Sequence, residues 1–354
     1  MEEKKRTPWR RWVLLVLLLM GCALGGGLAH LPWGLAPYSI PGVPPIQPEI
    51  SIAPEKLIET PLVTIPYLGD FYLVNTLTTL LVTLVLLGLL AYFSNRSMKQ
   101  SLKTDLVPRG VGAIMEAALE LLYNLTEGSA GVKWAPVIFP WFATIMIYVL
   151  LANLLKLIPG FESFGILHPA SPGYAVADYG WIGALLPGKQ ASGFALVPLF
   201  RGVSLDLNFT ASLALISVVM IQVVGFRAQG FEYFSKFFNV RNLFKVPFFG
   251  AMDFIVGLLE TISEFVKIIS FALRLFFNMF AGLVLVAVVS SLLGFFTLAP
   301  AMLFLFELFV GIIQAFVFGM LTMVFMAMAT AGHAHEEEHH DEAAVETPAE
   351  AHLI

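Results

Sequence analysis

The sequence is poor in charged residues, which make up only 13% of its 354 residues, whereas 58% are hydrophobic. Soluble domains carry about 25% charged residues, because their surfaces face water. So low a charge content excludes an ordinary soluble domain and predicts a protein that is solvated by lipid. The net charge of −5 comes from acids gathered at the C-terminal end, and the rest of the chain is slightly basic.

Cysteine is almost absent, since Cys22 is the only one; this excludes an internal disulfide and a cysteine-based metal site. No glycine-rich loop of the GxxxxGK[ST] type occurs, so we expect no nucleotide site on this chain. His335 and His339 do enclose three glutamates in the HExxH order. They stand in a charged tail rather than in the shaped cavity that a zinc site needs. We therefore expect a solvated tail and neither a metal nor a cofactor.

Long apolar runs dominate instead. A membrane-spanning helix needs about 20 apolar residues, and several stretches reach or approach this length. They are 12–29, 72–93, 137–155, 209–226, 254–293 and 301–329. Lys and Arg gather before the first, after the second and after the fourth stretch, and such basic loops lie on the cytoplasmic side. The expected fold class is an all-α integral membrane protein with five to six transmembrane helices and a cytoplasmic C-terminus.

The first stretch has a second interpretation. A basic start before an apolar run is also typical of a signal peptide, and the residues up to Cys22 loosely resemble a lipoprotein processing site. Removal or lipidation there would leave five crossings, so both possibilities stay open. The expected organisation is an extra helix or signal-like segment (1–35), a proline-rich external segment (36–70), a membrane domain (71–332) and an acidic, histidine-rich cytoplasmic tail (333–354).

Two connections differ from the spans. In residues 111–125 apolar side chains recur at helical spacing with the polar ones set apart, which predicts an amphipathic helix at the cytoplasmic interface. Residues 163–197 contain three prolines and are expected to form an irregular external loop.

Two charges lie where charges are rare, because Arg274 and Glu307 are the only ionised side chains between residues 268 and 332. A charge near mid-bilayer costs about 2.5–3.5 kcal/mol on insertion scales. Arg274 could extend to a lipid headgroup, as cations near helix ends do. The sequence stays mainly apolar for several turns after it, however, which favours a functional charge within the membrane.

The polar residues of the same segment share one face of the predicted helix, within about 80°. They are Glu260, Glu264, Lys267, Arg274, Asn278 and Gly282. Such a stripe indicates a hydrated path or a polar partner surface. A helix over 252–293 would be roughly 60 Å long, about twice the hydrocarbon thickness. No proline breaks it, so we expect it to be steeply tilted.

The last stretch carries Glu307 and Gln314, which are seven residues apart and therefore share a helix face. A carboxylate at this depth is either neutral or paired. Two interpretations stay open, a proton relay and a buried structural hydrogen bond to another helix.

Four motifs, in order along the chain, resemble those of subunit a of the F-type ATP synthase. The most specific is Ser-Phe-Ala-Leu-Arg-Leu-Phe-Phe-Asn-Met-Phe-Ala-Gly at residues 270–282. The others lie at 153–160, 206–210 and 314–322. The resemblance covers most of the chain after residue 70. It implies two long tilted helices that face a ring of c subunits.

The resemblance also implies roles for individual residues. Arg274 would be the essential arginine that faces the ring carboxylate, holds it ionised and prevents protons from leaking between two half-channels. Asn278 and Gln314 would line these channels. Asp206 would lie near the external entrance and Glu260 on the cytoplasmic path.

One position departs from the family pattern. The position after the motif glycine and the position of Glu307 often hold a Glu and a His, in either order. Here Leu283 occupies the first of them. The exchange partner of Glu307 is therefore missing or replaced.

The implied partners are the c-ring, the b subunits of the peripheral stalk, the lipid bilayer and, indirectly, the soluble catalytic sector; nucleic acid is not among them. The implied location is the bacterial plasma (inner) membrane. The alternative function is a secondary transporter in which Arg274 binds an anionic substrate, and this would need internal repeats and broken helices. The choice between protons and sodium as the coupling ion stays open.

Overall fold

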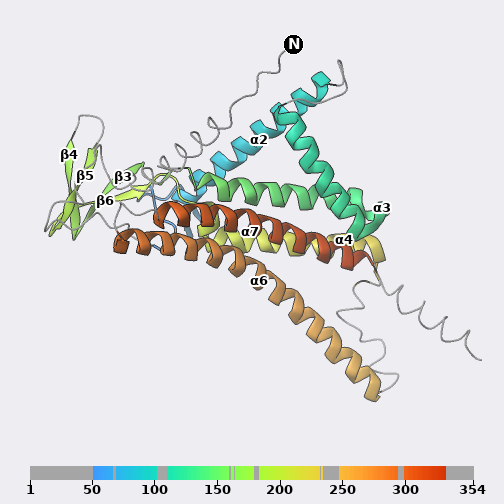
Figure 1. The fold of residues 1–354 in the computed structure, drawn as a ribbon. Coiled ribbons are helices and arrows are strands. Elements are labelled where there is room, and N and C mark those ends of the chain that lie inside the picture. The colour runs from blue at the N-terminus through green and yellow to red at the C-terminus, as the bar shows by residue number, and fades with distance from the viewer. Residues whose placement is uncertain are drawn as a thin grey trace, which may run out of the picture. The chain divides into compact units, whose positions relative to one another are not determined.

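In the computed structural model the chain is mainly helical, with two small antiparallel sheets (Figure 1). The structure describes residues 51–66, 69–101, 110–158, 161–162, 164–178, 183–231, 233, 247–293 and 299–331. The predicted span 12–29, with Cys22, and the histidine-rich tail lie outside these residues. Within the described part of the chain, five helices are long and apolar enough to cross a membrane.

The long helices correspond to the five predicted spans that the structure describes. They are α2 (Asn75–Ser101), α3 (Val111–Leu155), α4 (Leu207–Gln229), α6 (Pro247–Leu293) and α7 (Ala299–Thr330). A helix bonds all its backbone groups internally, as hydrocarbon requires, and the multi-span membrane architecture is confirmed. α6 continues over 47 residues, a length of roughly 70 Å. Its steep tilt stays a prediction.

α3 joins the predicted amphipathic helix to the span that follows it. Gly131, with φ 73° and ψ 164°, interrupts the helix between them. Glycine takes such a positive φ readily because it has no Cβ. In the part before Gly131, Leu122 is buried whereas Glu116 and Glu120 are exposed. The helix is therefore two-sided, and its place at the membrane interface stays a prediction.

The expectation of an irregular loop at residues 163–197 is wrong. Four strands occupy this segment: β3 (Gly165–Ala170), β4 (Gly173–Asp178), β5 (Gly183–Gln190) and β6 (Gly193–Pro198). They form an antiparallel sheet in the order β3-β6-β4-β5. The prolines that indicated a loop fit this sheet, because Pro169 and Pro187 lie on its edge strands β3 and β5. An edge strand tolerates the missing N–H of proline.

Short elements precede α2 and α4. Strands β1 (Val63–Ile65) and β2 (Gly69–Phe71) pair in front of α2, and the 3-10 helix η1 (Val203–Leu205) precedes α4. Arg201 connects these regions, because its backbone N–H donates to Thr79 Oγ1 at 3.0 Å and its Nη1 donates to Ala53 O at 2.8 Å. The entrance to α4 is thus held against the start of α2.

The chain divides into two compact units. Unit 1 comprises Met1–Tyr92, Ile147–Thr210 and Ala272–Phe316, and unit 2 comprises Phe93–Met146, Ala211–Phe271 and Val317–Ile354. Each long helix contributes residues to both. In unit 2, α3, α4 and α7 share an apolar core, whose most buried side chains include Ile138, Phe142, Ile221, Met323 and Met326.

Gly319 provides a test of this core. A Cβ at Gly319 would lie 2.9 Å from Met146 Cβ and 3.1 Å from Phe142 Cε2, so α7 approaches α3 closely here. Gly319→Val should destabilise the protein by about 1–3 kcal/mol through overpacking. The midpoint of thermal unfolding in detergent measures this. Gly88→Val, on α2, is the matched control because its Cβ meets nothing within 4 Å; equal losses in both variants would contradict the prediction.

Candidate ion path

Glu307 on α7 forms a buried ion pair with Lys156, the residue that follows α3. Lys156 Nζ lies 2.6 Å from Glu307 Oε1, and the two side chains are only 5% and 9% exposed. Buried charges are stable only when they are paired. The carboxylate of Glu307 is therefore paired with the lysine that directly follows α3, and the replacement of its exchange partner stays a prediction.

Glu307 also lies against α6. A Cβ at Gly282 would be only 3.1 Å from Glu307 Oε1. The glycine leaves room for the carboxylate, which packs beside the α6 backbone in unit 1. The position that precedes Leu283 is thus the one that contacts Glu307.

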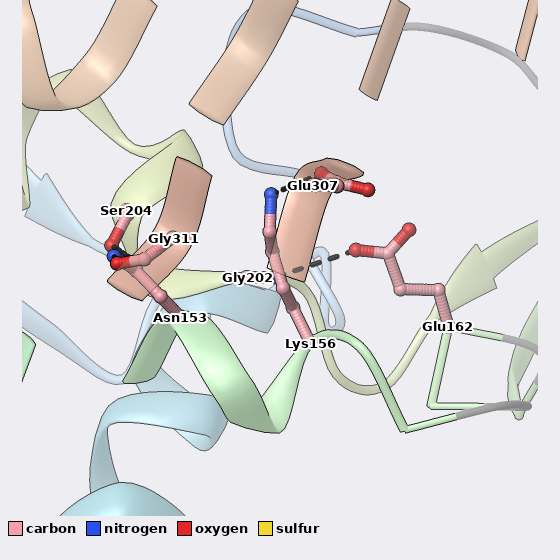
Figure 2. Close-up of polar contacts among 7 residues, drawn as sticks. All are labelled: Asn153, Lys156, Glu162, Gly202, Ser204, Glu307 and Gly311. Atoms are coloured by element: carbon pink, nitrogen blue, oxygen red, sulfur yellow. Dashed lines mark hydrogen bonds and ion pairs between the residues drawn. The ribbon is translucent and has the colours of Figure 1, made fainter. Parts of the chain in front are cut away.

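Asn153 links three elements beside this ion pair (Figure 2). Its Nδ2 donates to Gly311 O on α7 at 3.2 Å, and its Oδ1 accepts from Ser204 Oγ in η1 at 2.7 Å. Asn153 is completely buried. Because both ends of its amide are bonded, it fixes the end of α3 relative to α7 and η1.

Glu162 brings a second carboxylate to this region (Figure 2). The Gly202 N–H donates to its Oε1 at 3.4 Å. Burial raises the pKa of Glu162 above its ordinary value, and the charge of Glu307 adds to this; the Gly202 hydrogen bond and the charges of Lys156 and Arg201 act in the opposite direction. We name the whole group the α3–α7 polar cluster. It consists of Asn153, Lys156, Glu162, Ser204 and Glu307.

A second polar layer joins α6 and α7. Asn278 Nδ2 donates to Gln314 Oε1 at 2.6 Å, and Gln314 is 3% exposed. Asn278 precedes Gly282 by about one turn, and Gln314 follows Glu307 by about two turns. The two helices therefore run antiparallel, and this layer lies on the Arg274 side of Glu307. Among the described residues, Gln314 Nε2 has no hydrogen-bond partner although it is buried.

Arg274 lies one turn further along α6 from Asn278. Its side chain is exposed, and no residue in the described ranges forms a hydrogen bond or an ion pair with it. Phe277, close to Arg274 around the helix, is 56% exposed, whereas Leu275 and Met279, which are turned away from Arg274, are completely buried. The face of α6 that carries Arg274 is thus left uncovered by the described part of the chain.

Asp206 occupies a capping position at the start of α4. Its Oδ1 accepts from the Asn208 N–H at 2.9 Å, and its Oδ2 accepts from Thr76 Oγ1 on α2 at 2.8 Å. Its side chain is buried. A carboxylate here satisfies an otherwise unbonded N–H at the helix start. The predicted role of Asp206 near an external entrance stays a prediction beside this structural one.

Unit 2 contains a separate polar group, the α4–α6 polar cluster of Gln222, Tyr233, Glu260, Glu264 and Lys267. Lys267 Nζ lies 2.7 Å from Glu264 Oε1, and the Tyr233 hydroxyl donates to Gln222 Oε1 at 2.7 Å. Burial raises the pKa of Tyr233 to about 12, with further contributions from Glu264 and Glu260. Glu264 is buried and Glu260 is half-buried.

Sequence reasoning missed Lys156 and Glu162 as site residues. Lys156 lies inside the motif at 153–160, and its isolation after a long apolar run was the available signal. Glu162 carried no local signal, because only the folded chain brings it near Lys156. Within the described residues, no three His, Cys, Asp or Glu side chains are grouped as a metal site would require.

The chain has several helices that can cross a membrane. Along α6 and α7 it also has a buried carboxylate, a pair of hydrogen-bonded amides and an exposed arginine, in that order. Together these features are those of an ion-conducting membrane subunit. The chain belongs to the ATP synthase A chain family, whose model matches residues 76–327.

Known relatives agree with this assignment. ATP synthase subunit a of Acidothermus cellulolyticus is 28% identical over 239 residues, which are 66% of this chain and 71% of that protein. The subunit a of Moorella thermoacetica is 26% identical over 77% of this chain and 97% of its own length. The subunit a of Propionigenium modestum, described as sodium ion specific, is 28% identical over 77% of this chain and 80% of its own.

Asp206 can be tested by two substitutions. Asp206→Ala removes the cap of α4 and should cost about 1 kcal/mol of stability. Asp206→Asn keeps an oxygen that accepts from Asn208 and should retain the wild-type unfolding midpoint in detergent. A midpoint for the Asn variant as low as that of the Ala variant would contradict the capping role. Ion transport by the Asn variant, at normal assembly, separately reports whether the negative charge is needed.

Proposed function

We propose that this chain is the proton-translocating stator subunit of the membrane sector of an F-type ATP synthase. It would couple proton flow to rotation of a ring of c subunits and so to ATP synthesis. The observation that carries this proposal is Arg274, an exposed cation on an apolar helix with no partner among the described residues. An opposite charge on another subunit would offset the cost of a cation in the membrane. A carboxylate of the ring fits this requirement.

The order of polar groups along α6 supports two separate half-channels. Asn278 and Gly282, which contact Gln314 and Glu307, lie on the C-terminal side of Arg274. Glu260 and Glu264 lie on its N-terminal side. In this proposal protons reach the ring through the first group and leave through the second, and Arg274 prevents direct passage between them.

The gradient would drive rotation in one direction. A ring carboxylate that approaches Arg274 loses its proton, because the cation stabilises the ionised form. After it has passed, it takes up a proton from the other half-channel. Each charge that crosses the membrane potential contributes about 2.3 kcal/mol per 100 mV.

The basic loops support an orientation of the chain. Lys and Arg between α2 and α3 and between α4 and α6 favour a cytoplasmic position for these connections. The sheet β3–β6 and the α3–α7 polar cluster would then lie at the external side, and the tail 333–354 in the cytoplasm of a bacterial cell whose plasma (inner) membrane holds the protein. The proposed neighbours are the c-ring and the b subunits of the peripheral stalk.

Arg274→Ala tests the proposal. In the purified complex reconstituted into vesicles, ATP addition should acidify the lumen, and the variant should reduce this to background because ring carboxylates are no longer held ionised. Arg227→Ala, which removes an exposed arginine at the end of α4, is the matched control and should pump normally.

Three results would contradict the proposal. The first is undiminished pumping by an assembled Arg274→Ala complex. The second is uptake of an anionic substrate by the chain without a ring, which would favour a secondary transporter. The third is ATP-driven transport that depends on sodium and persists with a protonophore, which would overturn protons as the coupling ion.

A further inference from the structure

We propose that Lys156 is a positioning residue of the ion path: it holds the Glu307 carboxylate beside Gly282, where Glu307 receives protons from the external side and passes them toward Asn278 and Gln314. This inference rests on the proposed function and adds to it a residue from α3. Lys156 itself would not carry the transported proton.

The geometry supports a positioning role rather than a chance contact. Lys156 Nζ and Glu307 Oε1 are 2.6 Å apart, and both side chains are at least nine-tenths buried. Gly282 at the same time leaves room for the carboxylate, because a Cβ there would lie 3.1 Å from the same oxygen. The carboxylate therefore lies between a cation that follows α3 and the glycine of α6.

The charges around Glu307 come from three parts of unit 1. Lys156 follows α3, Glu162 lies in the connection after it, and Arg201 lies before η1; the charges of Lys156, Arg201 and Glu307 all act on Glu162. On α6, Gly282 faces Glu307. The Lys156 ammonium is thus close to two carboxyl groups. Its removal leaves Glu307 and Glu162 with less positive charge nearby.

The proton step needs no further reactant. A hydronium ion transfers its proton to the Glu307 carboxylate and becomes water, so that Glu307 is a neutral acid while Lys156 keeps its three hydrogens. Glu307 then gives the proton to water beside the Asn278–Gln314 layer, two turns along α7, from which it passes to a ring carboxylate, and Glu307 re-forms its ion pair. The buried Gln314 Nε2 that lacks a partner in the described chain is a suitable place for a bridging water.

The pH profile of pumping separates this role from a purely structural one. ATP-driven proton pumping by the reconstituted complex is measured from pH 5 to 9 and divided by the amount of assembled complex. In Lys156→Met the profile should differ from that of the wild type, with pumping at its optimum reduced by about tenfold or more, because the Glu307 carboxylate is no longer held in place by the ion pair. Lys156→Arg should retain the wild-type profile.

Two further variants separate the proposed role of Lys156 from a loss of stability and from the general effect of removing a lysine. Lys56→Met removes an exposed lysine that stacks on Tyr72 in the same unit, and it should leave the profile unchanged. If Lys156→Met fails to assemble, the exchange Lys156→Glu with Glu307→Lys restores an ion pair. This double variant should assemble but pump at least tenfold more slowly. Its carboxylate is attached at position 156 and no longer at position 307 of α7, beside Gly282.

Two outcomes would overturn the inference while leaving the proposed function intact. One is an unchanged pH profile in assembled Lys156→Met, with only the yield reduced. The other is full pumping by the exchanged pair, which would mean that the ion pair serves assembly alone. A wild-type complex that does not pump protons at all would instead contradict the proposed function.

Discussion

A charged side chain within a membrane needs a partner of opposite sign, and this requirement organises the polar residues of the chain. Glu307 has Lys156, and Glu264 has Lys267. Arg274, in contrast, faces outward and has no such partner in the described residues. The two internal pairs form within the chain, whereas a partner for the arginine, in the proposed function, comes from another subunit.

The antiparallel course of α6 and α7 places their polar contacts in an ordered series. Because the helices run in opposite directions, Gly282 meets Glu307 and Asn278 meets Gln314, so polar layers succeed one another toward Arg274. Leu275 and Met279, which lie on α6 among these layers, are completely buried apolar side chains. Because α6 is continuous, the spacing and direction of these positions along its axis are fixed. In a helix broken at a binding site they would not be.

Much of this was predictable because helical spacing is local. The spans, the continuity of α6, and the placing of Asn278 and Arg274 on one face follow from the sequence and from an ideal helix. The Lys156–Glu307 pair joins residues 151 positions apart, and no pattern within either helix encodes it. The β3–β6 sheet escaped prediction for a different reason: prolines usually end strands, yet here Pro169 and Pro187 lie on edge strands, where their missing donor is harmless.

Gly282 has a consequence for how this family can vary. A methyl group there would reach within 3.1 Å of Glu307 Oε1, so the volumes of residues 282 and 307 are sterically linked. A larger side chain at 282 requires a shorter or differently directed acid at 307, and such an acid would in turn lose its reach to Lys156. Substitutions at these three positions are therefore expected to occur together in related sequences, as a correlated set and not as independent changes.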